Sequence, residues 1–257
     1  MPHPLAGKRI VITRADAQAD GFVAALHACG ASPILFPTIQ IVPITPNPAL
    51  EKVIRKLGQF DWVVFTSANG VRIVCDHLAS HDLSPALLNQ VKVAAIGSAT
   101  AQVLAENRVQ VALVPADYVA ESLADALLAS GSLAGQCCLL LRAETVRPTL
   151  VDQLIAHGAQ VESVPVYQTQ LGQPSPSAYA ELRSGVDMLT FTSASTVHHF
   201  VQLLGAEAYP LANRALVACI GPITAQAARS LGLRVDVIAS TYTIAGLLQA
   251  LEEFQPL

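Results

Sequence analysis

Residues 7–40 read GKRIVITRADAQADGFVAALHACGASPILFPTIQ: a short apolar run, a helical stretch, a glycine and a second apolar run. The same order returns at residues 135–170 as GQCCLLLRAETVRPTLVDQLIAHGAQVESVPVYQTQ. Apolar runs rich in Val, Ile and Leu that flank a helical stretch predict a strand–helix–strand unit. Gly30 and Gly158 follow the two helices at the position where a left-handed residue commonly ends a helix. The chain therefore contains one such unit twice.

Two further pairs of segments extend the repeat over nearly the whole chain. Residues 60–74 (FDWVVFTSANGVRIV) return as 186–200 (VDMLTFTSASTVHHF), and residues 91–118 return as 215–242. The offset between the copies drifts only from 128 positions at the first pair to 124 at the last. A period this long corresponds to a whole small domain, so the sequence predicts a duplicated domain rather than a solenoid.

Each copy has five expected strands, and helical stretches separate them. Continuous apolar strands between helices indicate a parallel sheet that is covered on both faces. We therefore predict two α/β domains of the doubly wound, flavodoxin-like kind. The expected strands are residues 10–13, 33–36, 62–66, 93–97 and 111–114 in the first copy, and 138–142, 161–166, 188–192, 217–221 and 235–239 in the second.

Two extended, Pro-containing stretches interrupt the α/β rhythm. Residues 38–48 and 167–177 both follow the second strand of their copy. Segments of this kind commonly pass between domains. They suggest that the chain leaves the first domain after its second strand, builds the second domain and returns. Simple tandem domains with variable loops at these positions are the alternative.

Composition excludes several classes of protein. Apolar residues make up 52% of the 257 residues and charged residues 13%, which excludes a disordered chain. The net charge of −4 gives no basic field for nucleic acid, and no apolar run is long enough to span a membrane. The N-terminus lacks a signal-peptide pattern and the cysteines are odd in number, which is typical of reduced thiols. We expect a cytoplasmic monomer.

Four loops at the carboxyl ends of expected strands recur between the copies. Residues 66–69 (TSAN) match 192–195 (TSAS), and residues 97–100 (GSAT) match 221–224 (GPIT). Open parallel sheets bind ligands at this edge, where backbone N–H groups and the helix dipole favour an anion. Plain helix capping is the alternative for each loop. The candidate anion-binding residues are Thr66, Ser67, Asn69, Ser98, Thr100, Ser193, Ser195, Gly221 and Thr224.

An arginine follows the first strand of each copy, Arg14 in one and Arg142 in the other. A guanidinium at this edge suits a carboxylate. The alternative is that the two arginines only pair with Asp16 and Glu144. No Cys/His spacing is typical of a zinc site, and no Ser-His-Asp or Cys-His grouping follows from the sequence. We therefore expect no metal and a reaction that the substrate nearly performs unaided.

The duplicated frame resembles the uroporphyrinogen-III synthase family. The resemblance covers nearly the whole chain, and the order and spacing of its motifs make it specific. Members of this family close the linear tetrapyrrole hydroxymethylbilane into a ring with inversion of ring D, a step of porphyrin and heme biosynthesis. The matching motifs are residues 11–14 (VITR), 65–69 (FTSAN), 96–100 (IGSAT), 165–169 (PVYQT) and 220–225 (IGPITA).

The resemblance implies a particular architecture and reaction. Two flavodoxin-like lobes would be joined by a two-stranded extended linker, and the substrate would bind in the cleft between them. The enzyme would be a lyase without a cofactor or metal, acting through loss of water and a spiro intermediate on a substrate with eight carboxylates. Lobe 1 would comprise residues 1–37 with 172–257, lobe 2 residues 40–166, and the linker segments residues 38–46 and 167–177.

The resemblance also implies a catalytic residue, because Tyr167 matches a family tyrosine near the interdomain link. Its hydroxyl would donate to the leaving hydroxyl of the substrate. A tyrosine that only packs and hydrogen-bonds locally is the alternative. In the constant register Tyr167 corresponds to Ile39, so this side chain belongs to one copy only. The chain departs from some relatives at Ala68, Asn69 and Ile223, which leaves open how these loops contact a carboxylate.

Two other functions remain open at this point. A non-catalytic, two-lobed binding or sensor module for a small polyanion would share the hinged cleft and the anion-binding helix starts. A two-lobed enzyme with a nucleotide-linked donor would normally have a more Gly-rich diphosphate loop and an acidic residue for the ribose.

Overall fold

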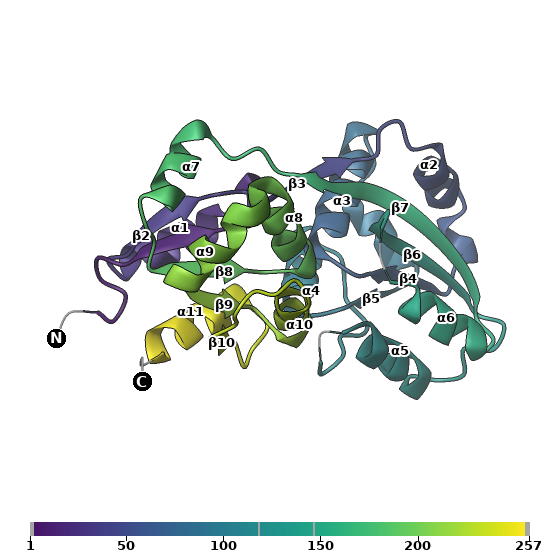
Figure 1. The fold of residues 1–257 in the computed structure, drawn as a ribbon. Helices are drawn as coiled ribbons and strands as arrows, with labels where there is room; N and C mark the ends of the chain where they lie inside the picture. The colour runs from purple at the N-terminus through teal and green to yellow at the C-terminus, as the bar shows by residue number, and fades with distance from the viewer. Residues whose placement is uncertain (1–2, 118, 146, 255–257) are drawn as a thin grey trace. The chain divides into compact units, whose positions relative to one another are not determined.

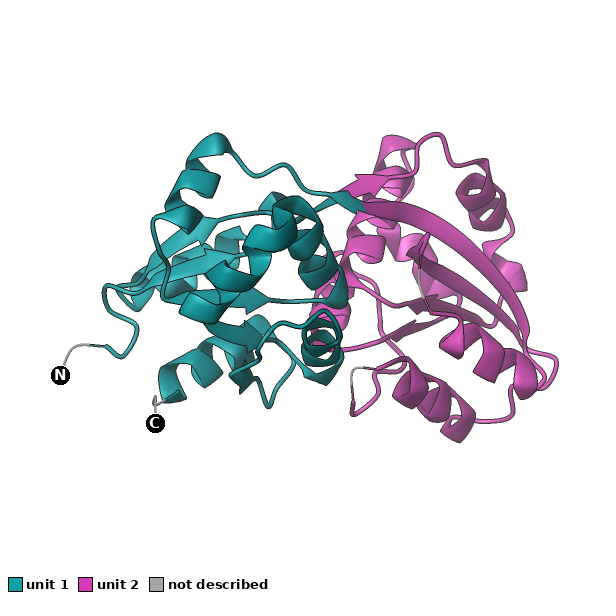
Figure 2. Ribbon diagram, viewed as in Figure 1, with its two compact units in different colours: residues 1–40, 170–257 teal, residues 41–169 magenta. Residues whose placement is uncertain are grey.

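The computed structural model describes residues 3–117, 119–145 and 147–254, and it divides the chain into two compact units. Unit 1 comprises Met1–Gln40 with Gln170–Leu257, and unit 2 is Ile41–Thr169 (Figure 2). Unit 1 is therefore built from both ends of the chain, whereas unit 2 is continuous.

Unit 1 contains a five-stranded sheet in the order β10-β9-β8-β1-β2, and every strand pair is parallel (Figure 1). In order of first appearance along the chain, this sheet is the 2-1-3-4-5 arrangement of a flavodoxin-like domain. The prediction of a parallel, doubly wound α/β fold is confirmed. The strands are β1 (Arg9–Ile12), β2 (Ser32–Leu35), β8 (Met188–Phe191), β9 (Leu216–Cys219) and β10 (Val237–Ile238).

Both faces of this sheet are buried, because side chains alternate along each strand. Val11 of β1 belongs to one hydrophobic cluster, whereas Ile10 and Ile12 belong to another. Helices α7, α8, α9 and α10 contribute to the first cluster, and α1 and α11 contribute to the second. The helical elements are η1 (Asp16–Gln18), α1 (Asp20–Ala28), α7 (Pro176–Arg183), α8 (Ala194–Leu204), η4 (Gly205–Glu207), α9 (Ala208–Arg214), α10 (Pro222–Ser230) and α11 (Ile244–Glu253).

Unit 2 is built around a sheet in the order β3-β7-β6-β4-β5. Its strands β7, β6, β4 and β5 repeat the first four positions of the flavodoxin-like order, and β3 adds an edge strand. The ends of β3 and β7 extend past the unit boundary into unit 1. The strands are β3 (Ile39–Pro43), β4 (Trp62–Phe65), β5 (Lys92–Ala95), β6 (Cys137–Ala143) and β7 (Gln160–Leu171).

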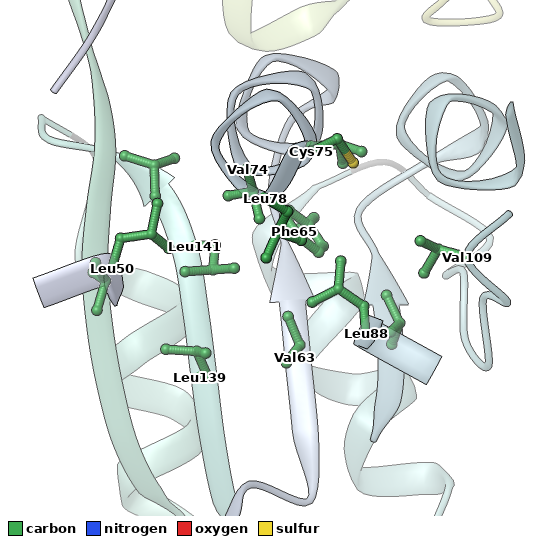
Figure 3. Packing of buried hydrophobic residues seen from close by; sticks show 14 of the residues in the cluster. Leu50, Val63, Phe65, Val74, Cys75, Leu78, Leu88, Val109, Leu139 and Leu141 are labelled. Carbon is green, nitrogen blue, oxygen red and sulfur yellow. The ribbon is translucent and has the colours of Figure 1, made fainter. Parts of the chain in front are cut away.

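The core of unit 2 also lies on both faces of its sheet. Val63 and Phe65 of β4 join one buried cluster, and Trp62 joins the other. Figure 3 shows Val63 and Phe65 beside Leu139 and Leu141 of β6. The helical elements are α2 (Pro48–Arg55), η2 (Leu57–Gln59), α3 (Ala68–Ser80), η3 (Pro85–Gln90), α4 (Ser98–Glu106), α5 (Ala120–Ala129) and α6 (Thr149–Ala156). None of the helices described in either unit is long and apolar enough to cross a membrane.

The predicted helix stops are confirmed. Gly30 and Gly158 follow α1 and α6 with φ of 73° and 83°, the left-handed region that a side chain rarely adopts. Both glycines donate a backbone hydrogen bond that closes the last turn, Gly30 to His27 and Gly158 to Ile155. The two copies therefore end their first helix in the same way.

The predicted fifth strand of the first copy, residues 111–114, is wrong as a strand. The segment makes one isolated parallel bridge, Ala94 with Leu113, and two backbone hydrogen bonds to β5. Pro115 follows directly and has no N–H with which to extend the ladder. The corresponding strand of the second copy, predicted as residues 235–239, is only the two-residue β10.

The two segments that connect the units pair with each other. Gly172 donates to the carbonyl of Thr38 at 2.8 Å, and Ile44 donates to that of Val166 at 3.0 Å. The partner numbers run in opposite directions, so the segments are antiparallel. A Cβ at Gly172 would lie 2.0 Å from the carbonyl oxygen of Pro37, so only glycine allows this approach.

Candidate functional site

In unit 2 the carboxyl ends of β4, β5 and β6 lie at one edge of the sheet, because these strands are parallel and adjacent. Thr66 follows β4 directly, Gly97 lies two residues after β5, and Arg142 lies near the end of β6. Ligands of open α/β sheets bind at this edge. The predicted residues of unit 2 therefore lie where a ligand site is expected.

A bulge between β6 and β7 determines the position of Tyr167. Arg142 is in register with Pro165, but the next residue of β6, Ala143, is in register with Tyr167. Val166 is the extra residue, and such a bulge redirects the side chains that follow it. The carbonyl of Tyr167 accepts from the N–H of Glu144 at 2.8 Å, which fixes its backbone.

The Tyr167 side chain contacts the loop that follows β4. Its hydroxyl lies 2.9 Å from the Oγ of Ser67, and the side chain of Asn69 also forms a hydrogen bond with it. Only 6% of Tyr167 is exposed, and its ring belongs to the same buried cluster as Phe65. The predicted residues Ser67, Asn69 and Tyr167 are thus in direct contact, although Tyr167 lies about 100 positions from the other two.

The pKa of Tyr167 lies above its ordinary value. Burial raises the pKa by penalising the phenolate, and the hydrogen bonds with Ser67 and Asn69 lower it in part. The phenol therefore remains protonated at neutral pH. A neutral phenol in this position can donate a hydrogen bond to an oxygen atom that acquires negative charge.

Ser67 also has the capping role that was its alternative interpretation. Its Oγ accepts from the N–H of Gly70 at 3.1 Å and so caps α3. A Cβ at Gly70 would lie 3.3 Å from the carbonyl oxygen of Leu141, so the glycine allows α3 to lie close to β6. Capping and contact with Tyr167 are combined in one hydroxyl.

A small cavity at the same edge is lined by Thr66 and Arg142. Its volume is about 190 Å³, and the remaining lining residues are Ile96, Ala120, Leu140, Arg147, Leu150 and Val151. The walls are mostly apolar and the polar groups are a hydroxyl and two guanidinium groups. This composition suits a ligand with an apolar body and an anionic substituent.

The guanidinium of Arg142 is held by its neighbours. Its Nε donates to the Oγ of Ser163 at 2.5 Å, and Nη1 donates to the carbonyls of Ala143 and Glu144 at 2.8 and 3.1 Å. The contact with Glu144 is therefore to its backbone, not the carboxylate pair that was the alternative. Arg147 is exposed and lies 3.7 Å from the carboxylate of Glu121.

The loop after β5 differs from the loop after β4. Gly97 is the N-cap residue of α4 and provides no side-chain cap. The exposed Ser98 is the first residue of the helix, where no side chain caps the backbone N–H groups. Thr100 is buried, with 4% of it exposed. Backbone N–H groups at this helix start, together with the Ser98 hydroxyl, are the groups that could receive a carboxylate.

The predicted residues of unit 1 occupy equivalent positions. Ser193 caps α8 in a capping box with Thr196, and Ser195 is the second residue of that helix. Gly221 is the N-cap of α10 without a side-chain cap, as Gly97 is for α4, and Thr224 is buried like Thr100. The loop pairs therefore have the same local structure in both units.

Arg14 lies two residues after β1 in unit 1 and is half-buried. Its Nη2 donates to the Oε1 of Gln18 at 3.3 Å, within the segment that leads into α1. Asp16, which was its expected partner in the alternative interpretation, begins the short helix η1.

Sequence reasoning missed Tyr242 of unit 1. A Cβ at Gly221 would lie 3.1 Å from the Tyr242 ring, and 37% of this tyrosine is exposed. The aromatic side chain thus lies against the start of α10, beside the predicted anion-binding loop. The two residues are 21 positions apart, as are Gly97 and Tyr118 in the first copy, so the repeat itself was the signal that could have identified Tyr242.

Comparison with known proteins identifies the family. The model of the family described as uroporphyrinogen-III synthase HemD matches residues 20–249. The uroporphyrinogen-III synthase of Synechococcus elongatus is 35% identical over 98% of this chain and 97% of its own length. The porphyrin biosynthesis protein HemD of Ruminiclostridium josui is 31% identical over 98% of this chain and 50% of its own.

Solved structures agree on the fold. A mutant uroporphyrinogen III synthase from Thermus thermophilus superposes with a TM-score of 0.64 at 23% identity, covering 95% of this chain and 96% of the other. The Helicobacter pylori uroporphyrinogen-III synthetase gives a TM-score of 0.59 at 19% identity, covering 95% and 97%. The chain belongs to the uroporphyrinogen-III synthase family.

Proposed function

We propose that this chain closes hydroxymethylbilane into uroporphyrinogen III, with loss of water and inversion of ring D. The observation that carries the proposal is the buried, neutral phenol of Tyr167, held by Ser67 and Asn69 at the carboxyl edge of the unit 2 sheet. The family membership supports the same reaction, since relatives that this chain matches over nearly their whole length carry that name.

In the proposed reaction Tyr167 assists the departure of the substrate's hydroxyl group. The bond from the methylene carbon to this hydroxyl breaks as the pyrrole nitrogen supplies electrons to form an azafulvene cation. The departing hydroxyl takes up one proton from solvent and leaves as water, and ring D releases one proton when it closes again. The Tyr167 hydroxyl donates a hydrogen bond to the departing oxygen. Because burial raises its pKa, the phenol stabilises the leaving group as a hydrogen-bond donor rather than as a strong acid.

Ring D then determines which isomer forms. Its substituted carbon attacks the cation and gives a spiro intermediate, which fragments and closes again with ring D inverted. The protein's contribution to this step is positional, because the unassisted substrate also closes but without inversion. Groups that hold the substrate's carboxylates therefore determine the product.

The carboxylates would be bound by the strand-end groups of both units. In unit 2 these are Thr66, Ser98 and Arg142, and in unit 1 the corresponding groups are Arg14 and the start of α10 at Gly221. Backbone N–H groups, hydroxyls and a few arginines suffice for a polyanion even in a chain of net charge −4, because they act locally. The buried Thr100 and Thr224 would support these loops and contact the substrate only through small movements.

One assay tests the activity. The protein is incubated with freshly generated hydroxymethylbilane, the products are oxidised, and the type I and type III isomers are separated by chromatography. We expect type III to dominate with protein and type I without it. Type I alone in both samples would contradict the proposal, and binding of the substrate without turnover would instead indicate a binding module.

A further inference from the structure

Three potential metal ligands meet in unit 1, away from the proposed catalytic edge. His3 lies in the segment that precedes β1, Cys29 directly follows α1, and Glu252 lies in the last turn of α11. Helices α1 and α11 start near the carboxyl ends of parallel strands and return along the sheet, so their last turns lie at its amino edge. The predicted ligand residues of unit 1 lie at the opposite edge.

The distances between the three ligand atoms suit one metal ion. The Oε1 of Glu252 lies 3.5 Å from the Nε2 of His3 and 3.5 Å from the Sγ of Cys29, and all three atoms lie within 4.8 Å of one another. Zinc bonds of about 2.0 Å to nitrogen and oxygen and about 2.3 Å to sulfur place tetrahedral ligands about 3.3–3.6 Å apart. The two distances from Glu252 match this separation, and the distance between His3 and Cys29 is at most 4.8 Å.

Without a metal, the contact between His3 and Glu252 is long. The Cys29 thiol would donate to Glu252, and Glu252 would pair with protonated His3. Hydrogen bonds between charged groups are normally about 2.7–2.9 Å long, which is shorter than the 3.5 Å between the His3 and Glu252 atoms. The 3.5 Å between Cys29 and Glu252 is an ordinary thiol hydrogen bond, so the long His3–Glu252 contact is the one that a central ion would explain.

Packing holds the three residues in place. Leu5, Leu26 and Leu251 lie next to or near His3, Cys29 and Glu252 in the chain, and all three leucines are buried in a single cluster. The backbones that carry the ligands are therefore fixed by the core of unit 1, which lowers the entropy lost on binding. The side chains of His3 and Glu252 are 37% and 32% exposed, so an ion can enter from solvent.

We propose that His3, Cys29 and Glu252 bind a divalent ion of the zinc class, with water in the fourth position. The mixed nitrogen, sulfur and oxygen donor set suits Zn²⁺ and Co²⁺ rather than Mg²⁺ or Ca²⁺. Coordination displaces the thiol proton and places the imidazole proton on Nδ1, which gives up the long 3.3 Å hydrogen bond from the Leu5 N–H. The ion would join the segment before β1, helix α1 and helix α11.

Cobalt titration of the full chain tests the site. The protein is stripped with a chelator under reducing conditions and titrated with Co²⁺, which gives a thiolate-to-cobalt charge-transfer band only when a sulfur coordinates. We expect one equivalent to produce the band and Zn²⁺ to displace it and raise Tm. Cys29→Ser should abolish the band, and His3→Gln and Glu252→Gln should each weaken Co²⁺ binding at least about tenfold.

Cys137→Ser is the matched control. Cys29 and Cys137 are the two cysteines that are not buried, and Cys137 lies in unit 2. The band should survive in this variant. Absence of a band in the unmodified chain, its persistence in Cys29→Ser or an equal rise of Tm with Zn²⁺ in Cys29→Ser would overturn the site. None of these results depends on turnover of hydroxymethylbilane.

Discussion

In each unit a residue near the connecting segments contacts the start of a helix, α8 in unit 1 and α3 in unit 2, and the two contacts differ. In unit 1 the fully buried Oγ of Thr38 lies 3.0 Å from the carbonyls of Thr13 and Thr196, so its hydroxyl hydrogen-bonds only to backbone groups. In unit 2 the same connection is a hydroxyl–hydroxyl contact, Tyr167 to Ser67 at 2.9 Å. A duplicated frame thus has a purely structural link in one copy and a phenol that can act on a ligand in the other.

The loops that precede α4 and α10, in contrast, have the same structure in both units. Gly97 and Gly221 are both N-caps in extended conformation without a side-chain cap, and Thr100 and Thr224 are both buried behind them. Features kept in both copies suit binding of a substrate that carries similar carboxylates on every ring. The feature found in one copy suits a step that occurs once.

The largest effect is expected when Tyr167 of unit 2 is replaced by the residue at the equivalent position of the first copy. Tyr167→Ile places there the residue that the register aligns from the other copy, Ile39. We expect type III formation to fall by about 100-fold and the free energy of unfolding to fall by about 2 kcal/mol, because a hydroxyl donor and a buried ring are lost. Isomer chromatography and urea unfolding measure the two effects. Unchanged turnover would show that the asymmetry has no role in the chemistry.

Removal of the Arg142 guanidinium tests whether the loops at the strand ends bind the substrate's carboxylates. Arg142→Ala should raise KM about tenfold with little change in kcat, because a charge-assisted hydrogen bond to a carboxylate is lost in ground and transition states alike. Arg55→Ala, which removes an exposed arginine of α2 in the same unit, is the control. Equal KM values for the two variants would show that Arg142 only supports its own loop.

Thr38→Val tests the structural link of unit 1. The shape is conserved but the hydroxyl is lost, so we expect a destabilisation of about 1 kcal/mol with kcat unchanged. The cost stays small because the carbonyl of Thr13 also accepts from the backbone N–H of Thr38. Urea unfolding and steady-state kinetics check both parts, and a fall in kcat comparable to that of the Tyr167 variant would remove the distinction between the units.

Gly221→Ala tests the contact that the sequence did not reveal. The added Cβ would lie 3.1 Å from the Tyr242 ring, so the ring must move by a few tenths of an ångström. We expect a loss of stability of about 1 kcal/mol or less and a small rise in KM. Gly58→Ala is the control, because a Cβ there meets no atom within 4 Å. A Gly221 variant as stable as the Gly58 variant would show that the ring adapts freely.

The smallest expected effect is a pH dependence of stability. Burial raises the pKa of Tyr167 from its ordinary value of 10.0, so the unfolded chain loses the phenolic proton at lower pH than the folded chain. The contribution to stability is complete below pH 10 and is lost as pH rises through the folded-state value. The difference in unfolding free energy between wild type and Tyr167→Phe should therefore shrink above pH 10. A difference that is constant or grows with pH would contradict the raised pKa.

Much of the fold could be predicted because the relevant signals are local. Short apolar runs, helical stretches and the glycines at positions 30 and 158 each act within a few residues, and duplication displays them twice. The predicted strand at residues 111–114 was wrong. Its apolar pattern is that of a strand, but whether it pairs depends on the contact with β5 and on the proline that follows, which the pattern does not reveal.

The site could be predicted only in part, because its contacts join distant residues. Ser67 and Tyr167 were both identified, but their contact depends on the bulge at Val166, which no local pattern marks. Tyr242 was missed because its proximity to Gly221 arises from the path of a loop. The ligands of the proposed metal site are separated by 26 and 223 positions, so no spacing motif exists to be found.

The most direct test of the distinction between the units is a paired measurement of kcat in Tyr167→Phe and Thr38→Val at saturating hydroxymethylbilane. Each variant removes one hydroxyl and keeps the shape of its side chain. If the phenol of unit 2 acts on the leaving hydroxyl, kcat for type III formation falls by about 100-fold in Tyr167→Phe and stays at the wild-type value in Thr38→Val. Equal kcat values in the two variants would contradict the account.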